Sequence, residues 1–320
     1  MSFEYTEITD PLYVENKDHT GEDDFIMVRA KQYSNVPIKI SHWVPKAHCF
    51  TTMFKQHEQE LLEAEVYPDD VWVISYPKSG TTWAQEMVWL ICNDLNFEAA
   101  RADSLATRFP FLEVSVIHSV PISSFEKAKN TPRPRFIKSH LPVSMLPKRY
   151  WEVKPKTIYI RRNPKSVAVS YFYHSQGIHY RGSIDTFVRS FAREHQFYSP
   201  YHAHVIEYHE LQDCDNILHL SFEEMKHYLP SVVKKVCEFF GKSYSKSELD
   251  LLYQHLSFKS MRDNPTVNYR NPNAPASEEQ FIRKGEAEGW KKELTPEQIE
   301  LLDQWTKENV PNLEQRKLFA

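Results

Sequence analysis

Short apolar runs alternate with longer amphipathic segments along most of this chain. Runs rich in β-branched and aromatic residues predict buried strands at residues 71–74, 135–138, 157–160 and 217–220. Segments with helical spacing of apolar residues lie at residues 83–91, 164–176, 184–194, 229–240, 246–255 and 296–308. Strands separated by helices favour an α/β fold with a central parallel sheet flanked by helices.

The organisation of the chain indicates a single main domain. The sequence contains no internal repeat and no low-complexity linker, so we expect one domain over residues 41–320. Residues 1–40 are charged and irregular in pattern, and we interpret them as an N-terminal arm or lid. Residues 262–288 are rich in Asn, Pro, Arg and Glu, which predicts a long functional loop.

Composition narrows the function classes. The 320 residues carry a net charge of −4, which argues against broad nucleic-acid binding. The four cysteines are widely spread, which is typical of reduced structural thiols and not of a zinc or redox motif. The N-terminal residues are acidic and polar, and no run approaches the ~20 apolar residues of a membrane span. We therefore expect a cytoplasmic protein without membrane or nucleic-acid partners.

The segment that joins the strand at 71–74 to the following helix is suited to bind an anion. The first N–H groups of a helix lack backbone partners, and the helix dipole favours negative charge. The segment adds a cation, hydroxyl groups, a glycine that permits close approach and a flat aromatic ring: Lys78, Ser79, Gly80, Thr81, Thr82 and Trp83. It is not a Walker A motif, because the lysine precedes the only glycine.

Tyr76-Pro77-Lys78-Ser79-Gly80-Thr81-Thr82-Trp83 resembles the 5′-phosphosulfate loop of the cytosolic sulfotransferases over all eight residues. The resemblance extends from about residue 45 to residue 292. It implies a P-loop-like strand–loop–helix in a single α/β domain. It also implies 3′-phosphoadenosine 5′-phosphosulfate (PAPS) as sulfuryl donor, with 3′-phosphoadenosine 5′-phosphate (PAP) as product, and no metal.

Two further segments resemble the family's 3′-phosphate site. Arg162 lies in an Arg-Asn-Pro segment, and Ser170 follows it by eight residues. Far downstream, Arg283-Lys284-Gly285 resembles the Arg-Lys-Gly motif that closes over this phosphate. Here the chain departs from the family, since the next glycine is displaced by one residue before Trp290.

The resemblance also assigns an adenine site. Trp83 would stack on the ring, and Phe222 stands where a tyrosine is usual. Ser257 and Phe258 match the next family segment, which places Phe258 near the purine.

The catalytic residues implied by the resemblance are His140, Lys78, Lys138 and Ser170. His140 lies in Lys138-Ser139-His140-Leu141-Pro142, directly after a predicted strand, where a neutral imidazole can accept the proton of an acceptor hydroxyl. Lys78 suits the leaving phosphate and Lys138 the sulfuryl oxygens. Ser170 would hold Lys78 until the acceptor binds.

The resemblance implies that the acceptor is a small apolar molecule with a hydroxyl or amine. Family resemblance assigns Phe111, Phe172, Tyr198 and Tyr201 to its pocket. Phenols, catecholamines, steroids, retinoid alcohols and xenobiotics all fit an apolar pocket with one base. Elimination of sulfate from an activated alcohol after transfer, which gives a dehydration product, is also compatible with such a pocket.

Two alternative functions remain open from the sequence. One is a P-loop-type kinase acting on a small molecule, and the other is a binding protein that holds a nucleotide or apolar ligand without turnover.

A homodimer is possible, but Pro296 replaces valine in the family's usual dimer segment. Thr295 and Pro296 instead predict a capped helix start.

Overall fold

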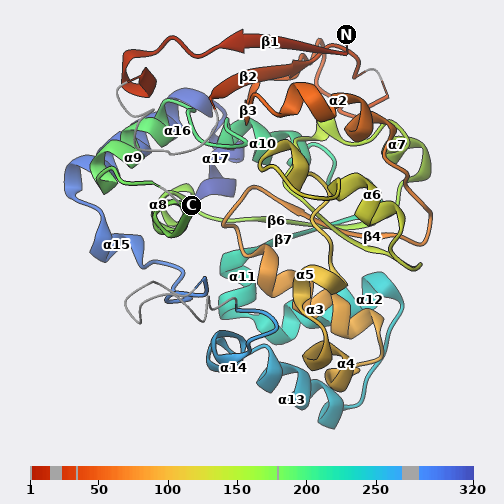
Figure 1. Cartoon of the computed structure of the whole chain (residues 1–320). Helices are drawn as coiled ribbons and strands as arrows, with labels where there is room; N and C mark the ends of the chain where they lie inside the picture. The colour runs from red at the N-terminus through yellow and green to blue at the C-terminus, as the bar shows by residue number, and fades with distance from the viewer. Residues whose placement is uncertain (1, 15–23, 34, 179, 269–280) are drawn as a thin grey trace.

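The computed structural model describes residues 2–14, 24–33, 35–178, 180–268 and 281–320. Its centre is a parallel sheet of strands in the order β5-β4-β6-β7 (Figure 1). The strands are β4 (Val71–Ser75), β5 (Phe136–Ser139), β6 (Lys156–Arg161) and β7 (Ile217–Ser221). The predicted α/β class, parallel sheet and strand positions are confirmed.

The sheet is buried on both faces, which explains why its strands are continuous apolar runs. Along β4, Trp72 and Ile74 pack into one core cluster, whereas Val71 and Val73 pack into the other. This division follows from the two-residue period of a strand.

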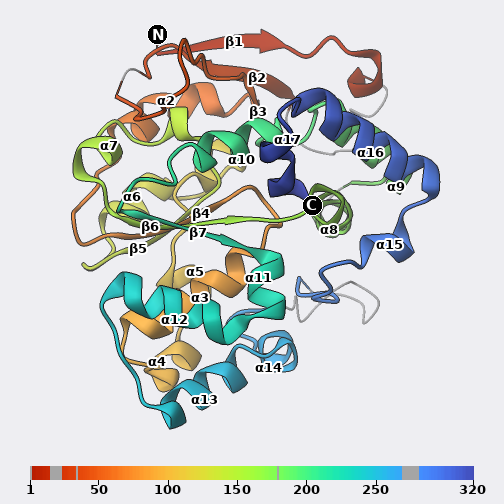
Figure 2. The ribbon, with the colours of Figure 1, turned by 180° about the vertical axis from the view of Figure 1, so that it is seen from behind.

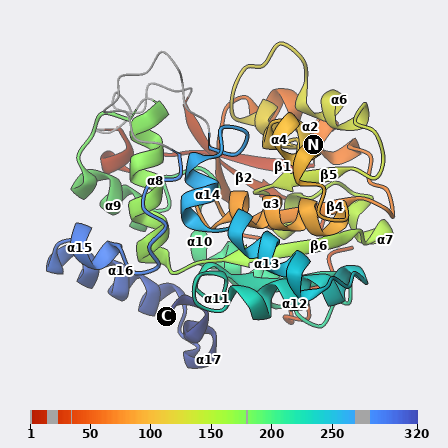
Figure 3. The same ribbon diagram turned by 90° about the horizontal axis from the view of Figure 1, so that it is seen from below.

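Helices cover each face. The face that lies below the sheet in Figure 1 carries α3 (Thr81–Cys92), α4 (Phe97–Ala102), α5 (Leu105–Arg108), α11 (Phe222–His227), α12 (Leu229–Phe240), α13 (Lys246–His255) and α14 (Phe258–Asp263). Figure 3, viewed from below, shows α3, α12, α13 and α14 across this face. The other face carries α2 (Phe54–Glu63), α6 (Ser124–Lys129), α7 (Tyr150–Val153), α10 (Tyr201–His209) and the short 3₁₀ turns η1 (Val114–Val116) and η2 (Val143–Met145).

A group of helices stands at one end of the sheet. It consists of α8 (Pro164–Ile178), α9 (Ile184–Ala192), α15 (Trp290–Glu293), α16 (Pro296–Asn309), α17 (Leu313–Arg316) and the turn η3 (Lys317–Phe319) (Figure 2). As predicted, α16 begins at Pro296, and Thr295 caps it in a capping box with Gln298.

The N-terminal residues are more regular than their sequence suggested. Strands β1 (Phe3–Glu7) and β2 (Phe25–Ala30) pair antiparallel, and β2 also pairs with β3 (His48–Thr51). The expectation of an irregular segment was wrong for these strands. Their exposed charged positions, such as Glu4 and Arg29, obscured the apolar side that Phe3 packs onto Phe54 of α2.

The predicted long loop begins two residues too early, because residues 262 and 263 still belong to α14. Its other described parts, residues 264–268 and 281–288, contain no helix or strand. The rest of that prediction, residues 269–280, lies outside the described residues. Residues 281–289 run back toward the ends of the parallel strands and join α15.

Candidate active site

The carboxyl ends of all four parallel strands open onto one cavity of about 530 Å³. Each strand is followed at once by residues that line it: Lys78 after β4, His140 after β5, Arg162 after β6 and Phe222 after β7. Residues 281–286 form another part of the wall. Open α/β sheets bind ligands at this edge, where the strand order reverses.

The loop between β4 and α3 has a conformation suited to anions. Lys78 and Gly80 have positive φ values of 67° and 101°, and Gly80 is the N-cap of α3. A Cβ atom on Gly80 would lie 2.8 Å from Cδ2 of Phe222, so glycine is required here by both strain and space. Gly80, Thr81 and Thr82 at the start of α3 line the cavity, and the first N–H groups of a helix lack intrahelical partners and favour anions.

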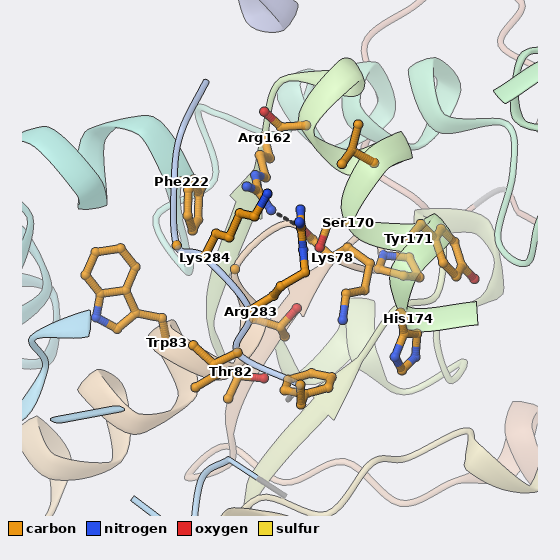
Figure 4. Close-up of a pocket in the computed structure, with 18 of the residues that line it drawn as sticks. Lys78, Thr82, Trp83, Arg162, Ser170, Tyr171, His174, Phe222, Arg283 and Lys284 are labelled. Carbon is orange, nitrogen blue, oxygen red and sulfur yellow. Dashed lines mark hydrogen bonds between the residues drawn. The ribbon is translucent and has the colours of Figure 1, made fainter. Parts of the chain in front are cut away.

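Six lysine and arginine residues line the described cavity: Lys78, Lys138, Arg162, Lys226, Arg283 and Lys284. Figure 4 shows Arg162, Arg283 and Lys284 gathered together, with Lys78 close by. Burial, followed by the charges of Lys138 and Arg162, lowers the pKa of Lys78 to about 7. Burial lowers the pKa of Lys138 to about 8. The cavity therefore concentrates positive charge, and burial favours the neutral forms of Lys78 and Lys138.

Arg162 joins two distant segments of the site. Its Nη1 donates to the carbonyl oxygen of Lys78 at 3.0 Å, and its Nη2 donates to that of Glu286 at 3.1 Å. Its guanidinium carbon lies 4.0 Å from the ring centroid of Phe222. Nε is buried and has no hydrogen-bond partner among the described residues, which leaves a donor for a ligand.

The two serines of this region behave differently. Ser170 lines the cavity from α8, two turns into the helix, where Figure 4 shows it beside Lys78. The side chain of Ser79 is fully buried outside the described lining, and its Oγ has no partner among the described residues. Sequence reasoning placed Ser79 in the site, but Ser79 is not among the residues that line the described cavity.

Aromatic residues form one end of the cavity. Trp83 donates its indole N–H to the carbonyl oxygen of Leu256 at 3.0 Å, and its ring lies edge-on to Phe222. Phe258 packs against Gly285, where a Cβ atom would lie 2.3 Å from the ring. Ser257 lines the cavity, although its hydroxyl also caps α14 by accepting from Ser260 N–H.

His140 is held in a single tautomer. Its Nδ1 lies 2.6 Å from the carbonyl oxygen of Ser75, which can only accept, so Nδ1 carries the proton. Burial, followed by the charge of Lys138, holds the pKa of the imidazole well below its ordinary value. His140 is therefore neutral, with Nε2 available as a proton acceptor.

Glu113 is a site residue that sequence reasoning missed. Its Oε1 accepts from the backbone N–H of His140 at 2.5 Å and from the hydroxyl of Tyr198 at 3.3 Å. Burial raises the pKa of this carboxyl to about 7. Its place two residues after Phe111, which was already assigned to the acceptor pocket, was the available signal.

Comparison with known proteins decides the family, because residues 68–314 match the Sulfotransferase domain. The chain belongs to the sulfotransferase family. It is 36% identical to luciferin sulfotransferase of Photinus pyralis over 283 residues, which covers 80% of this chain and 76% of that protein. It is also 36% identical to sulfotransferase 1B1 of Mus musculus over 272 residues, covering 83% and 89% of the two chains.

Solved sulfotransferase structures share the fold. A retinol dehydratase in complex with retinol and PAP superposes with a TM-score of 0.85 at 26% identity, covering 97% of both chains. Another structure of a retinol dehydratase contains androsterone and PAP, with the same TM-score and identity. Mouse sulfotransferase SULT7A1 complexed with PAP gives a TM-score of 0.68 at 27% identity, covering 85% of this chain and 96% of that chain.

The structure corrects two of the four residues that were assigned to the acceptor pocket of this sulfotransferase. Phe111 and Tyr198 line the cavity on either side of His140, with ring centroids 5.2 and 5.5 Å from the imidazole. Phe172 and Tyr201 are outside the described lining. Phe172 packs against Phe187 in the core, and the hydroxyl of Tyr201 donates to the carbonyl oxygen of Arg162.

Other aromatic residues take their place in the wall. Tyr171 and His174 come from α8, Phe25 comes from β2, and Phe197 packs on Phe25 with ring centroids 4.4 Å apart. Phe281 lies over Lys78, whose Nζ is 4.0 Å from the ring centroid. Only the three-dimensional fold brings these segments together, so no local motif marked them.

None of the helices among the described residues of this sulfotransferase has the length and apolar character to cross a membrane. In the same part of the chain, no group of three or more His, Cys, Asp or Glu side chains is arranged to hold a metal ion.

Proposed function

We propose that this sulfotransferase moves the sulfuryl group of PAPS to the hydroxyl or amine of a small apolar acceptor by in-line displacement, with His140 as general base. The observation that carries the proposal is the position of His140. Its proton-accepting nitrogen belongs to the same cavity as Lys78, Lys138 and the anion-binding start of α3.

The residues present fit PAPS. Gly80 and Gly285 have positive φ and pack against Phe222 and Phe258, so a Cβ atom at either glycine would close the approach to the aromatic end. The buried Nε of Arg162 lacks a partner among the described residues, as expected of a group that awaits an anion. Similar proteins have been solved with PAP bound.

Each part of the cofactor has residues suited to hold it. Lys78, the backbone of 79–82 and the hydroxyls of Thr81 and Thr82 would hold the 5′-phosphosulfate. Arg162, Ser170 and residues 283–285 would hold the 3′-phosphate. Trp83, Phe222 and Phe258 would enclose the adenine. When bound, PAPS supplies the activated sulfuryl group.

The chain's own residues then act on the acceptor and on developing charge. Nε2 of His140 takes the acceptor proton, because Nδ1 is already committed to Ser75. Lys78 stabilises charge on the leaving phosphate and Lys138 stabilises charge on the sulfuryl oxygens. Ser170 holds the ammonium group of Lys78 back from the leaving phosphate until acceptor is present.

The acceptor class follows from the walls around His140. Phe111, Tyr198, Phe25 and Phe197 make that end of the cavity aromatic and apolar. The most similar fold among the structures above belongs to retinol dehydratases solved with retinol or androsterone. We propose an apolar alcohol or phenol of that size range as acceptor, and the cytoplasm as its location by analogy with sulfotransferase 1 proteins.

Two copies of this chain would need another surface if they associate. The segment through which many sulfotransferases dimerise contains Pro296, which here starts α16. A proline in a capped helix start cannot donate a backbone hydrogen bond to an extended partner segment.

The test uses two donors and a panel of acceptors. We expect labelled PAPS to sulfate a nitrophenol, a steroid alcohol or retinol at full rate in excess EDTA, because fixed cations neutralise the donor. Sulfate released together with a dehydrated alcohol would identify elimination after transfer. Phosphoryl transfer from ATP with Mg²⁺, without transfer from PAPS, would refute the proposal in favour of a kinase. PAP binding without turnover of any acceptor would favour a binding protein.

A further inference from the structure

The carboxylate of Glu293, at the end of α15, forms ion pairs with Arg283 and Lys284, two of the cations proposed for the 3′-phosphate. Its Oε2 accepts from Nη1 of Arg283 at 2.9 Å, and its Oε1 accepts from Nη2 at 2.9 Å. Oε1 also accepts from Nζ of Lys284 at 3.1 Å. Glu293 thereby engages both ends of the guanidinium fork and the neighbouring ammonium group.

This arrangement is partly buried and lies in the cavity wall. The side chain of Glu293 is 8% exposed and that of Arg283 is 20% exposed. Burial raises the pKa of Glu293, but hydrogen bonds from Arg283, Tyr173 and Lys284 outweigh it and leave the pKa below its ordinary value. The group is therefore a carboxylate, and it is more than a solvent-exposed surface pair.

Arg162, the third cation proposed for the 3′-phosphate, makes a different kind of contact. Both terminal nitrogens of Arg162 donate to neutral backbone carbonyls. The second carboxylate in the described lining, Glu286, lies 3.6 Å from Lys292 and is 46% exposed. Glu293 is thus the carboxylate in direct contact with Arg283 and Lys284 in the described structure.

We propose that Glu293 is an internal competitor of the 3′-phosphate for Arg283 and Lys284, which lowers affinity for PAP and speeds its release. This inference rests on the proposed function. A phosphate that reaches the guanidinium fork must displace the carboxylate or share the fork with it, and two like charges on one cation repel each other. When PAP leaves, Glu293 again satisfies the cations, so the empty site does not keep them unpaired.

The isosteric change Glu293→Gln removes the charge and keeps the shape. We expect the variant to bind PAP about tenfold more tightly in calorimetry, with a slower dissociation rate in stopped-flow displacement. AMP lacks the 3′-phosphate, so its affinity should change by less than about twofold. A role in folding alone would weaken both nucleotides together.

Two controls separate charge from position. Glu288→Gln removes the same charge from an exposed residue that pairs with Lys291, and it should leave PAP affinity unchanged. In an Arg283→Ala background, Glu293→Gln should gain less than about threefold, because the contested fork is gone.

Two results would overturn the inference. One is PAP affinity in Glu293→Gln equal to or weaker than in the natural chain. The other is an equal gain in Glu288→Gln. Failure of the natural chain to bind PAP at all would instead refute the proposed function.

Discussion

Nδ1 of His140 lies 2.6 Å from the backbone carbonyl oxygen of Ser75, the last residue of β4. The last strand residue before the anion-binding loop thus also sets the tautomer of the proposed base. Because a carbonyl cannot donate, the imidazole keeps its Nε2 unprotonated toward the cavity at any pH where it is neutral. The geometry of the phosphate loop and the protonation of His140 are therefore coupled through one residue.

Replacing the proposed base should separate catalysis from cofactor binding. We expect His140→Ala to abolish measurable sulfuryl transfer, because no other described group combines a low pKa with a fixed acceptor nitrogen at this position. PAP affinity should stay within about threefold, since His140 is not among the cations. Turnover and PAP calorimetry on the same sample check this, and near-normal turnover would contradict the assignment.

Loss of Arg162 should act through the 3′-phosphate. Arg162→Ala should weaken PAP binding by about 2–3 kcal/mol, as for a charge-assisted contact left unmade. Adenosine 5′-phosphosulfate lacks that phosphate, and its affinity should change little. Equal losses for both ligands would instead mark Arg162 as a residue that only holds the loop at Glu286.

Cofactor binding should take up protons at mildly alkaline pH. The pKa of Lys78 is about 7 and that of Lys138 about 8 in the empty site, below the ordinary lysine value. A bound anion raises both pKa values, so PAP should bind with net proton uptake near pH 8. Calorimetry in buffers of different ionisation enthalpy measures the uptake. The number of protons taken up should be smaller in Lys78→Met. An unchanged proton uptake would contradict a rise in the pKa of Lys78 on PAP binding.

The same two lysines should affect stability in the empty protein. Their folded pKa values are depressed, so the unfolded chain binds more protons between about pH 7 and pH 10, and stability should rise with pH across that window. Below the folded pKa values the destabilisation is fully present. Urea unfolding of the natural chain and of Lys78→Met at both limits checks the sign, because the variant should show a smaller rise.

Gly80 should tolerate no side chain. Gly80→Ala would force alanine into a φ of 101° and place its Cβ against Phe222. We expect weaker PAP binding and a lower midpoint of thermal unfolding. Gly241→Ala is the matched control, because it also has positive φ but no atom within 4 Å of the added Cβ. It should lower stability through strain without changing PAP affinity.

Much of the fold was accessible from the sequence because its signals are local. The helices α12 and α13 start and end where the apolar spacing predicts, and the strand–loop–helix at Lys78 follows from consecutive residues. The N-terminal strands were not predicted, since each exposes charged residues on one side. In addition, β2 pairs with β3, which lies outside the segment that was interpreted as irregular.

The site residues likewise include some that local motifs predict and others that only the fold can place. Motifs that follow a strand, such as those around His140 and Arg162, lead directly to the cavity. Phe172 and Tyr201 could not be placed, because one step along α8 separates a cavity residue from a core residue, and a tyrosine hydroxyl can turn to a backbone carbonyl. Phe25, from β2, reaches the site only through tertiary contacts.

The two carbonyl contacts of Arg162 also bear on how the protein is made. Lys78 and Glu286 are separated from Arg162 by 84 and 124 positions. During synthesis the central sheet can therefore assemble well before the segment that completes the nucleotide site leaves the ribosome. A chain in which that segment has not docked would hold its core but bind PAP weakly. Ligand present at that stage would favour the docked form and draw the last steps of folding toward completion.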